Sequence, residues 1–122
     1  MPAFRICAAA ALGLAAAPAL AEMDFVTDPA LCGLDLIERH ERGMSFDGRF
    51  FSEIEYYCAL AEPLPRPDWQ SNATHISAGY CEEPGALFPG VFVLQTFQTE
   101  PGRLYVWQDD SGEAATYHLC EG

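Results

Sequence analysis

Residues 91–120 read VFVLQTFQTEPGRLYVWQDDSGEAATYHLC, and this stretch decides the fold class. Residues 100–102 (EPG) and 109–112 (DDSG) are sequences typical of turns. The runs around them are rich in β-branched and aromatic residues, as strands are. These runs are residues 91–98, 104–108 and 115–120. Consecutive short strands joined by turns predict an antiparallel meander.

The chain before residue 91 continues the same pattern. Residues 51–60 and 74–81 alternate along their length, which predicts two more half-buried strands. The pair Asp47-Gly48 between apolar residues predicts a hairpin, whereas the proline-rich stretch 62–67 predicts a loop. We therefore expect a mainly β fold, a small antiparallel meander barrel or sandwich of about six strands.

One or two short helices are expected before the first strand. Thr27-Asp28-Pro29 places a capping residue before a proline, and this start signal predicts a short helix or turn through Cys32. Residues 35–42 (DLIERHER) predict a second short helix before Gly43.

The first 21 residues have the pattern of an export signal. Arg5 gives the start a positive charge, an apolar run follows over residues 6–20, and small residues precede Glu22, the first acid of the chain. The run is shorter than the roughly 20 apolar residues of a membrane-spanning helix, and it lacks the polar face of an amphipathic helix. We expect cleavage after Ala21. Residues 22–122 would then form one small domain in the periplasm or outside the cell, with no stable membrane anchor.

Four cysteines follow the leader: Cys32, Cys58, Cys81 and Cys120. An even number in a small exported domain predicts two disulfides. The competing role is zinc binding, but zinc sites usually pair cysteines about two to four residues apart. The gaps here are 26, 23 and 39 residues. Following the expected meander places Cys58 and Cys120 at one end and Cys81 at the other, which favours the pairs Cys32–Cys81 and Cys58–Cys120.

The charge of the mature chain is strongly negative. All 18 acidic residues follow the leader, against five arginines and no lysine, so the formal charge of residues 22–122 is −13. Such a field repels nucleic acid and anionic membranes and attracts cationic proteins, although it also serves plain solubility. The composition therefore favours a basic protein as partner and argues against nucleic acid.

No motif in the sequence fixes a catalytic chemistry. The sequence has no Cys-x-x-Cys, no Gly-x-Ser-x-Gly and no phosphate-binding glycine loop. No pair of histidines shows ligand spacing on one element, so the pattern predicts neither a metal nor a cofactor. The histidines are His40, His75 and His118.

Paired carboxylates leave one enzymatic alternative open. Two facing acids can hydrolyse a glycosidic bond, provided that the fold supplies a cleft. Candidate pairs are Glu53/Glu55, Glu82/Glu83 and Asp109/Asp110.

Candidate partner-binding residues lie in the predicted turns, because binding residues concentrate in loops on a rigid β scaffold. They are Trp69, Glu82, Glu83, Asp109 and Asp110. The alternative for Trp69, and for Trp107, is that each plugs an end of a barrel.

The general form, a leader followed by a small disulfide-linked β domain, resembles that of periplasmic lysozyme and protease inhibitors at the level of architecture. Together with the charge and the missing catalytic motifs, it leads to a hypothesis. We expect an exported, non-enzymatic binding module of the cell envelope, an inhibitor of or partner to a cationic protein. The alternative is a small hydrolase that uses paired carboxylates.

Overall fold

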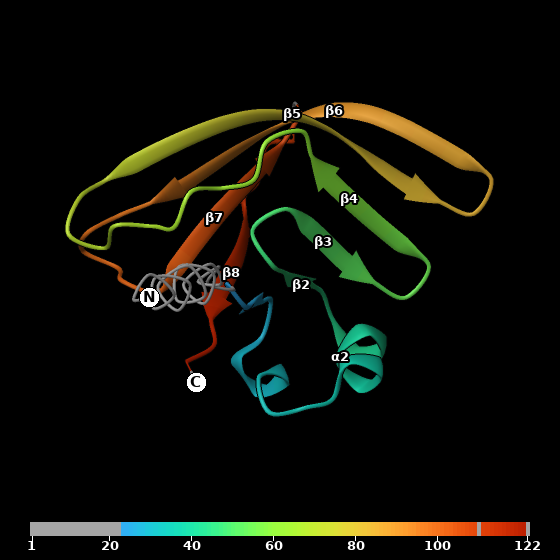
Figure 1. The fold of residues 1–122 in the computed structure, drawn as a ribbon, viewed down its shortest axis with the longest axis horizontal. Helices are drawn as coiled ribbons and strands as arrows, with labels where there is room; N and C mark the ends of the chain where they lie inside the picture. Colours follow the sequence, from blue (N-terminus) through green and yellow to red (C-terminus); the bar gives the residue numbers. More distant parts are fainter. Residues whose placement is uncertain (1–22, 110, 122) are drawn as a thin grey trace, which may run out of the picture.

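A computed structural model describes residues 23–109 and 111–121, and it forms a closed antiparallel barrel (Figure 1). Each strand pairs with the next along the chain, and β1 pairs with β8 to close the barrel. The strands are β1 (Phe25–Val26), β2 (Ser45–Phe46), β3 (Phe50–Glu53), β4 (Tyr56–Leu60), β5 (Ala73–Glu83), β6 (Ala86–Thr96), β7 (Arg103–Gln108) and β8 (Ala115–Leu119). The predicted mainly β meander is thus confirmed, with eight strands instead of about six. The predicted export signal, residues 1–21, lies outside the described residues.

Phenylalanine rings fill the inside of the barrel. Phe46 stacks on Phe51 with ring centroids 4.0 Å apart, and Phe51 stacks on Phe92 at 5.6 Å. Phe25 is fully buried beside them, at 6.2 Å from Phe46. Burying each such side chain contributes roughly 1.5–3 kcal/mol, and buried leucines and Val106 complete the same core.

The two predicted helices are confirmed. The short helix η2 (Pro29–Leu31) begins after Asp28, whose carboxylate accepts a hydrogen bond from Ala30 N. Helix α2 (Leu36–Arg42) begins after Asp35, whose carboxylate accepts one from Glu38 N, and it ends at Gly43. Both lie outside the barrel, beside the short strands β1 and β2 (Figure 1).

The helical segment is tied back to the ends of the β domain. Arg39 is buried on α2, and its Nη1 lies 2.7 Å from Asp24 Oδ1 while Nη2 donates to the carbonyl oxygen of Cys32. A disulfide joins Cys32 to Cys120, the residue after β8. Segment 27–44 therefore folds against the seam where the barrel closes.

The expectation of one strand over residues 51–60 is wrong. The chain turns at Ile54 and Glu55, so that this stretch supplies the end of β3 and the whole of β4. Glu55 adopts a left-handed backbone with a φ of 65°. Glycine and asparagine usually occupy such positions, so the residue types at this turn did not mark it.

The favoured disulfide pairing is also wrong, although all four cysteines do pair. The bridges are Cys32–Cys120 and Cys58–Cys81. Cys58 follows the unpredicted turn by three residues, so it lies at the same end of the barrel as Cys81, directly opposite it on β5. Segment 27–44 folds back, which brings Cys32 to Cys120 instead of Cys81.

The two ends of the barrel differ. The turn at 54–55, the turn at 84–85 and residues 111–114 before β8 lie at one end, which we call the mouth. The proline-rich segment 61–72 lies at the other end, where Leu64 is buried and the half-buried Trp69 packs on Phe25 at 6.4 Å. Trp69 therefore plugs the end opposite the mouth.

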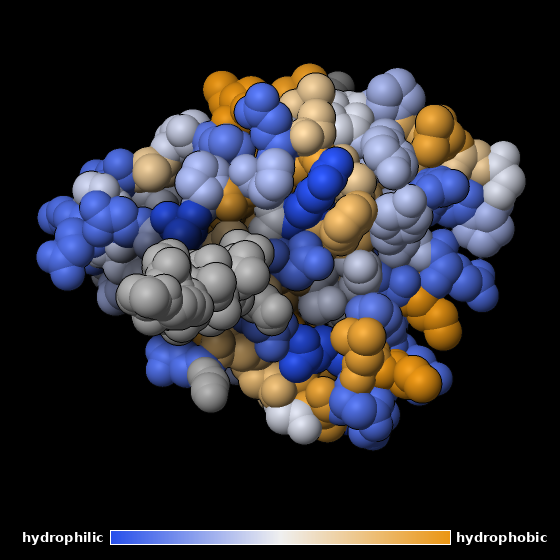
Figure 2. Space-filling view, viewed as in Figure 1, coloured by the Kyte–Doolittle hydropathy of each residue, from blue (hydrophilic) through white to orange (hydrophobic). Residues whose placement is uncertain are grey.

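The long hairpin β5–β6 carries apolar side chains on its outer face as well as its inner one. Ile76 pairs with Val93 and Ala78 with Val91, and all four point away from the core. Figure 2 shows apolar side chains gathered on the surface over this hairpin and over α2. A strand of a closed barrel has one inner face, so the apolar run 91–98 is only half buried.

Candidate functional site

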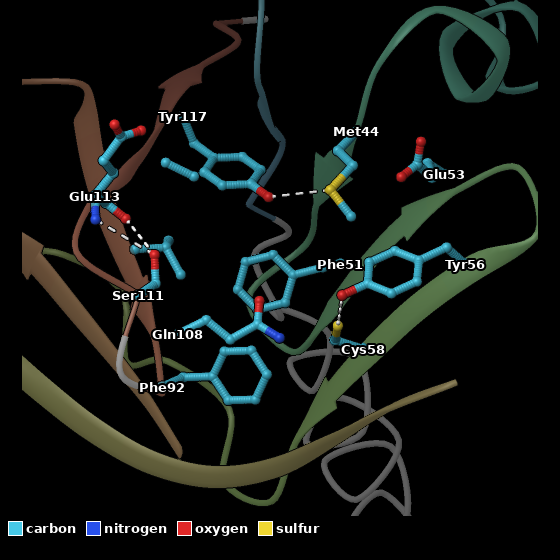
Figure 3. A pocket seen from close by; sticks show the side chains of 12 residues that line it. Met44, Phe51, Glu53, Tyr56, Cys58, Phe92, Gln108, Ser111, Glu113 and Tyr117 are labelled. Atoms are coloured by element: carbon cyan, nitrogen blue, oxygen red, sulfur yellow. Dashed lines mark hydrogen bonds between the residues drawn. The ribbon is translucent and has the colours of Figure 1, made fainter. Parts of the chain in front are cut away.

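A cavity opens at the mouth, above the phenylalanine stack. Its volume is about 200 Å³. Four aromatic rings line it, from Phe51, Tyr56, Phe92 and Tyr117. Figure 3 shows Glu53 and Glu113 on opposite sides of this mouth cavity, with the rings between them.

The strands place these side chains by simple alternation. On β3, Glu53 follows the core residue Phe51 by two positions and therefore points to the same inner side, one pleat nearer the mouth. Tyr56 stands in the same relation to Cys58 on β4. The mouth cavity is thus built from the last inward positions of strands whose other inward residues form the core.

Three polar groups in the mouth cavity have sulfur atoms as their hydrogen-bond partners. Tyr117 Oη donates to Met44 Sδ at 3.4 Å, and Gln108 Nε2 donates to Cys81 Sγ at 3.3 Å. Tyr56 Oη lies 3.4 Å from Cys58 Sγ, and the phenol is the donor because a disulfide sulfur carries no hydrogen. Sulfur is a weak acceptor, so these donors are only lightly engaged.

The pKa of Tyr117 reflects the electrostatics of the mouth cavity. Its side chain is 3% exposed. Burial raises the pKa of this phenol above the ordinary tyrosine value, and the nearby Tyr56 and Glu53 add to the rise. The Glu53 carboxylate therefore acts electrostatically on the interior of the mouth cavity.

A wider acidic groove adjoins the mouth cavity and shares Glu53 and Tyr56 with it. Its volume is about 410 Å³, and it runs between the turns of the β3–β4 and β5–β6 hairpins. Glu55, Glu82 and Glu83 line it. Tyr57 also lines this groove, and its Oη lies 3.3 Å from Tyr80 Oη. This hydrogen bond is the largest cause of the raised pKa of Tyr57, and a hydrogen bond to Glu82 is the second.

The charged residues lining the mouth cavity and the acidic groove are all acids, within the described chain. They are Glu53, Glu55, Glu82, Glu83 and Glu113. The described arginines lie elsewhere, with Arg39 and Arg42 on α2 and the other three at the opposite end of the barrel. The described lining of the two hollows is therefore negative, and α2 with Arg39 and Arg42 adjoins the β3–β4 turn, where Ile54 N donates to the carbonyl oxygen of His40 at 3.1 Å.

The five predicted partner-binding residues do not form one surface. Glu82 and Glu83 lie in the acidic groove, whereas Trp69 lies at the opposite end of the barrel. Asp109 is at the mouth end, but its carboxylate accepts a hydrogen bond from Val91 N at 2.8 Å and so holds the end of β7 against β6. Asp110 lies outside the described residues.

Trp107, for which an end-plugging role was the alternative, stands on the outer face of β7. Its indole Nε1 donates to Gln95 Oε1 at 3.0 Å on the neighbouring strand β6. This tryptophan therefore does not plug the barrel.

Sequence reasoning did not assign Tyr56, Glu113 and Tyr117 to a site. It considered Glu53 only as the strand-face partner of Glu55, but Glu53 ends β3 and Glu55 lies in the turn. Alternation marks which residues point inward, but it does not tell which inward residue is the last before an open end. The only usable signal was the proximity of Glu113 in the chain to the turn sequence 109–112.

The described histidines do not meet at the mouth. His40 Nε2 lies 3.3 Å from Ser45 Oγ, His75 lines a cavity under the proline-rich segment, and His118 lies on β8 opposite Arg103. Within residues 23–109 and 111–121, no three His, Cys, Asp or Glu side chains gather as metal ligands would. No helix in the described part of the chain is long and apolar enough to cross a membrane.

Comparisons of this chain with protein-family models, with curated proteins and with solved structures found no match.

Proposed function

We propose that this protein is an exported, non-enzymatic binding module of the cell envelope that binds a cationic protein through the mouth of its barrel. The observation that carries the proposal is the set of five acids, from the ends of β3 and β5, the β3–β4 turn and the segment before β8, that line the mouth cavity and the acidic groove with no basic residue among the described lining residues. The two disulfides suit the oxidising periplasm or extracellular space that the export signal predicts.

Like charges held close together favour a partner of opposite sign. Glu82 and Glu83 are neighbours at the tip of β5, and Glu55 lines the same groove from the adjacent hairpin. A basic surface that docks here replaces carboxylate repulsion by attraction. Such complementarity acts mainly on the rate of encounter.

The shape of the site supports binding more than hydrolysis. Below the mouth cavity the barrel is filled by the phenylalanine stack. The mouth cavity, at about 200 Å³, is smaller than the roughly 300–1,000 Å³ of most small-molecule sites. The groove beside it, at about 410 Å³, is within that range, but it lies between surface turns instead of enclosing a substrate. A hydrolase would have to hold a substrate between two carboxylates in this limited space.

The test measures association kinetics with the mature protein. Partners are captured from an envelope extract at 0.1 M salt and eluted at 1 M, where the screening length falls from about 10 Å to about 3 Å. Association of the captured protein, and of lysozyme as a defined basic probe, is then compared between wild type and the triple variant E55Q/E82Q/E83Q. We expect association to slow severalfold in the variant and at high salt, with a smaller change in dissociation.

A matched control removes three other charges. The variant E38Q/E62Q/E121Q changes the net charge equally at exposed acids outside the acidic groove, so its association rate should stay closer to wild type. Equal slowing in both triple variants would mean that net charge alone matters. An association rate that changes neither with salt nor with the substitutions would refute the proposed function. Turnover of a glycan by wild type but not by E53Q would favour the hydrolase.

A further inference from the structure

We infer that the mouth cavity is a binding site for an alkylammonium group, the end of a lysine side chain of the bound partner. This inference rests on the proposed function and names the chemical group that the mouth recognises. It draws on the size of the mouth cavity, the hydrogen-bonding state of its polar groups and its charge.

The size of the mouth cavity fits one extended side chain. An engineered apolar cavity of about 150 Å³ accommodates benzene, so a hollow slightly larger accepts about six to eight heavy atoms. The mouth cavity has a volume of about 200 Å³. Its inner wall is apolar, with the Phe51 and Phe92 rings fully buried and Val106 beside them, and this wall suits the methylene stem of a lysine.

The polar groups of the mouth cavity select for a ligand that donates hydrogen bonds. The Tyr56 and Tyr117 hydroxyls and the Gln108 amide nitrogen already donate to sulfur. Their oxygen atoms keep lone pairs that can accept. An ammonium group carries three donors and no acceptor, so it can use these lone pairs without displacing the weak hydrogen bonds to sulfur.

The charge of the mouth cavity points to the same ligand class. Glu53 and Glu113 stand on opposite sides of the hollow, and the four aromatic rings lie between them (Figure 3). Carboxylates attract the cation, and the faces of aromatic rings stabilise it further. The small volume and apolar inner wall suit the methylene stem and compact ammonium of lysine better than the wider, planar guanidinium of arginine.

Three small probes test the inference on the mature, disulfide-bonded protein. They are the Nα-acetyl methylamides of lysine, of norleucine and of arginine, titrated at low salt and followed by NMR shifts of the mouth residues. Norleucine keeps an alkyl stem but lacks the ammonium group. We expect the lysine probe to bind roughly tenfold more tightly than norleucine, as charge-assisted hydrogen bonds imply.

Variants identify the groups responsible. We expect E53Q to weaken lysine-probe binding roughly tenfold and Y117F to weaken it severalfold, while E62Q, an equal charge change outside both hollows, leaves it within about twofold. A single cooperative thermal transition in E53Q and in Y117F shows that the fold is retained. Equal binding of lysine and norleucine, tighter binding of arginine, or no binding of any probe at the mouth would each overturn the inference.

The outcomes also separate this inference from the proposed function. If lysine-probe binding is absent but E55Q/E82Q/E83Q still slows association with a cationic protein, the acidic groove binds that protein and the mouth cavity takes no side chain. If the lysine probe binds as expected but no cationic protein associates in a salt-dependent way, the mouth cavity is a site for small amines and the proposed function fails.

Discussion

Removing the Cys58–Cys81 disulfide should destabilise the protein more than removing Cys32–Cys120, although it closes the shorter loop. The bridges span 23 and 88 residues. The loop-closure relation assigns them about 3.5 and about 4.5 kcal/mol at 25 °C. Cys58 and Cys81 are also buried, at 2% and 4% exposure, whereas Cys32 and Cys120 are half-buried. Loss of two buried sulfur atoms adds about 1 kcal/mol each, which reverses the order.

Urea denaturation of C58A/C81A and C32A/C120A, without reductant at pH 7, measures both losses. The expected decreases in unfolding free energy are about 5.5 and about 4.5 kcal/mol. The variant C58V/C81V refills the core without restoring the bridge, so it should recover about 1–2 kcal/mol of the loss. If C32A/C120A proves clearly the less stable, or if valine recovers nothing, burial does not outweigh loop length and the reasoning is wrong.

A tryptic map of the unreduced protein checks the pairing itself. Trypsin does not cut before proline, so Arg66-Pro67 leaves residues 50–103 as one fragment that contains both Cys58 and Cys81. The observed bridges predict that this fragment carries an internal disulfide and stays separate from the fragments that hold Cys32 and Cys120. Either other pairing would join all three fragments.

Three further changes test the packing. Gly79→Ala should lower the free energy of unfolding, measured by urea denaturation, by about 2 kcal/mol or more, because the new Cβ would lie 2.3 Å from a carbonyl oxygen of β4. The control Gly112→Ala places its Cβ where nothing lies within 4 Å, so it should be nearly neutral. Asp24→Asn should lower the free energy of unfolding by about 2 kcal/mol in the same assay, because it leaves the buried Arg39 without its carboxylate. The loss is smaller than for a fully buried ion pair, since the Asp24 side chain is 43% exposed. The folded state holds the Tyr117 proton more tightly than the unfolded chain, so thermal stability should fall as the pH rises above about 10, and Y117F should lessen that fall.

The sequence predicted the parts of the fold whose turns carry distinctive residues. The turns at 47–48 and 100–102 contain glycine with aspartate or proline, and both were located correctly. The turn at Ile54 and Glu55 carries no such residue. Its backbone is imposed by the pairing of β3 with β4 around it, which is tertiary information that local residue types do not contain.

That single missed turn also accounts for an error elsewhere. Treating residues 51–60 as one strand places Cys58 far from Cys81, and the pairing argument then excludes the bridge that forms. It likewise placed Glu53 and Glu55 on one strand face, whereas Glu53 points into the mouth cavity and Glu55 lines the groove beside it. The closure of β1 onto β8 involves only the two residues of β1, which left no pattern long enough to recognise.

The acids that define the proposed site also act on the stability of the barrel. Five carboxylates at one end repel one another, and the two disulfides and the phenylalanine stack must offset that repulsion. A cationic partner would relieve the same repulsion, so binding and folding are linked through the same charges. Salt should therefore have opposite effects on the two: screening weakens the proposed attraction between partners while it stabilises the free protein. A protein whose acidic end served only solubility would show the second effect without the first.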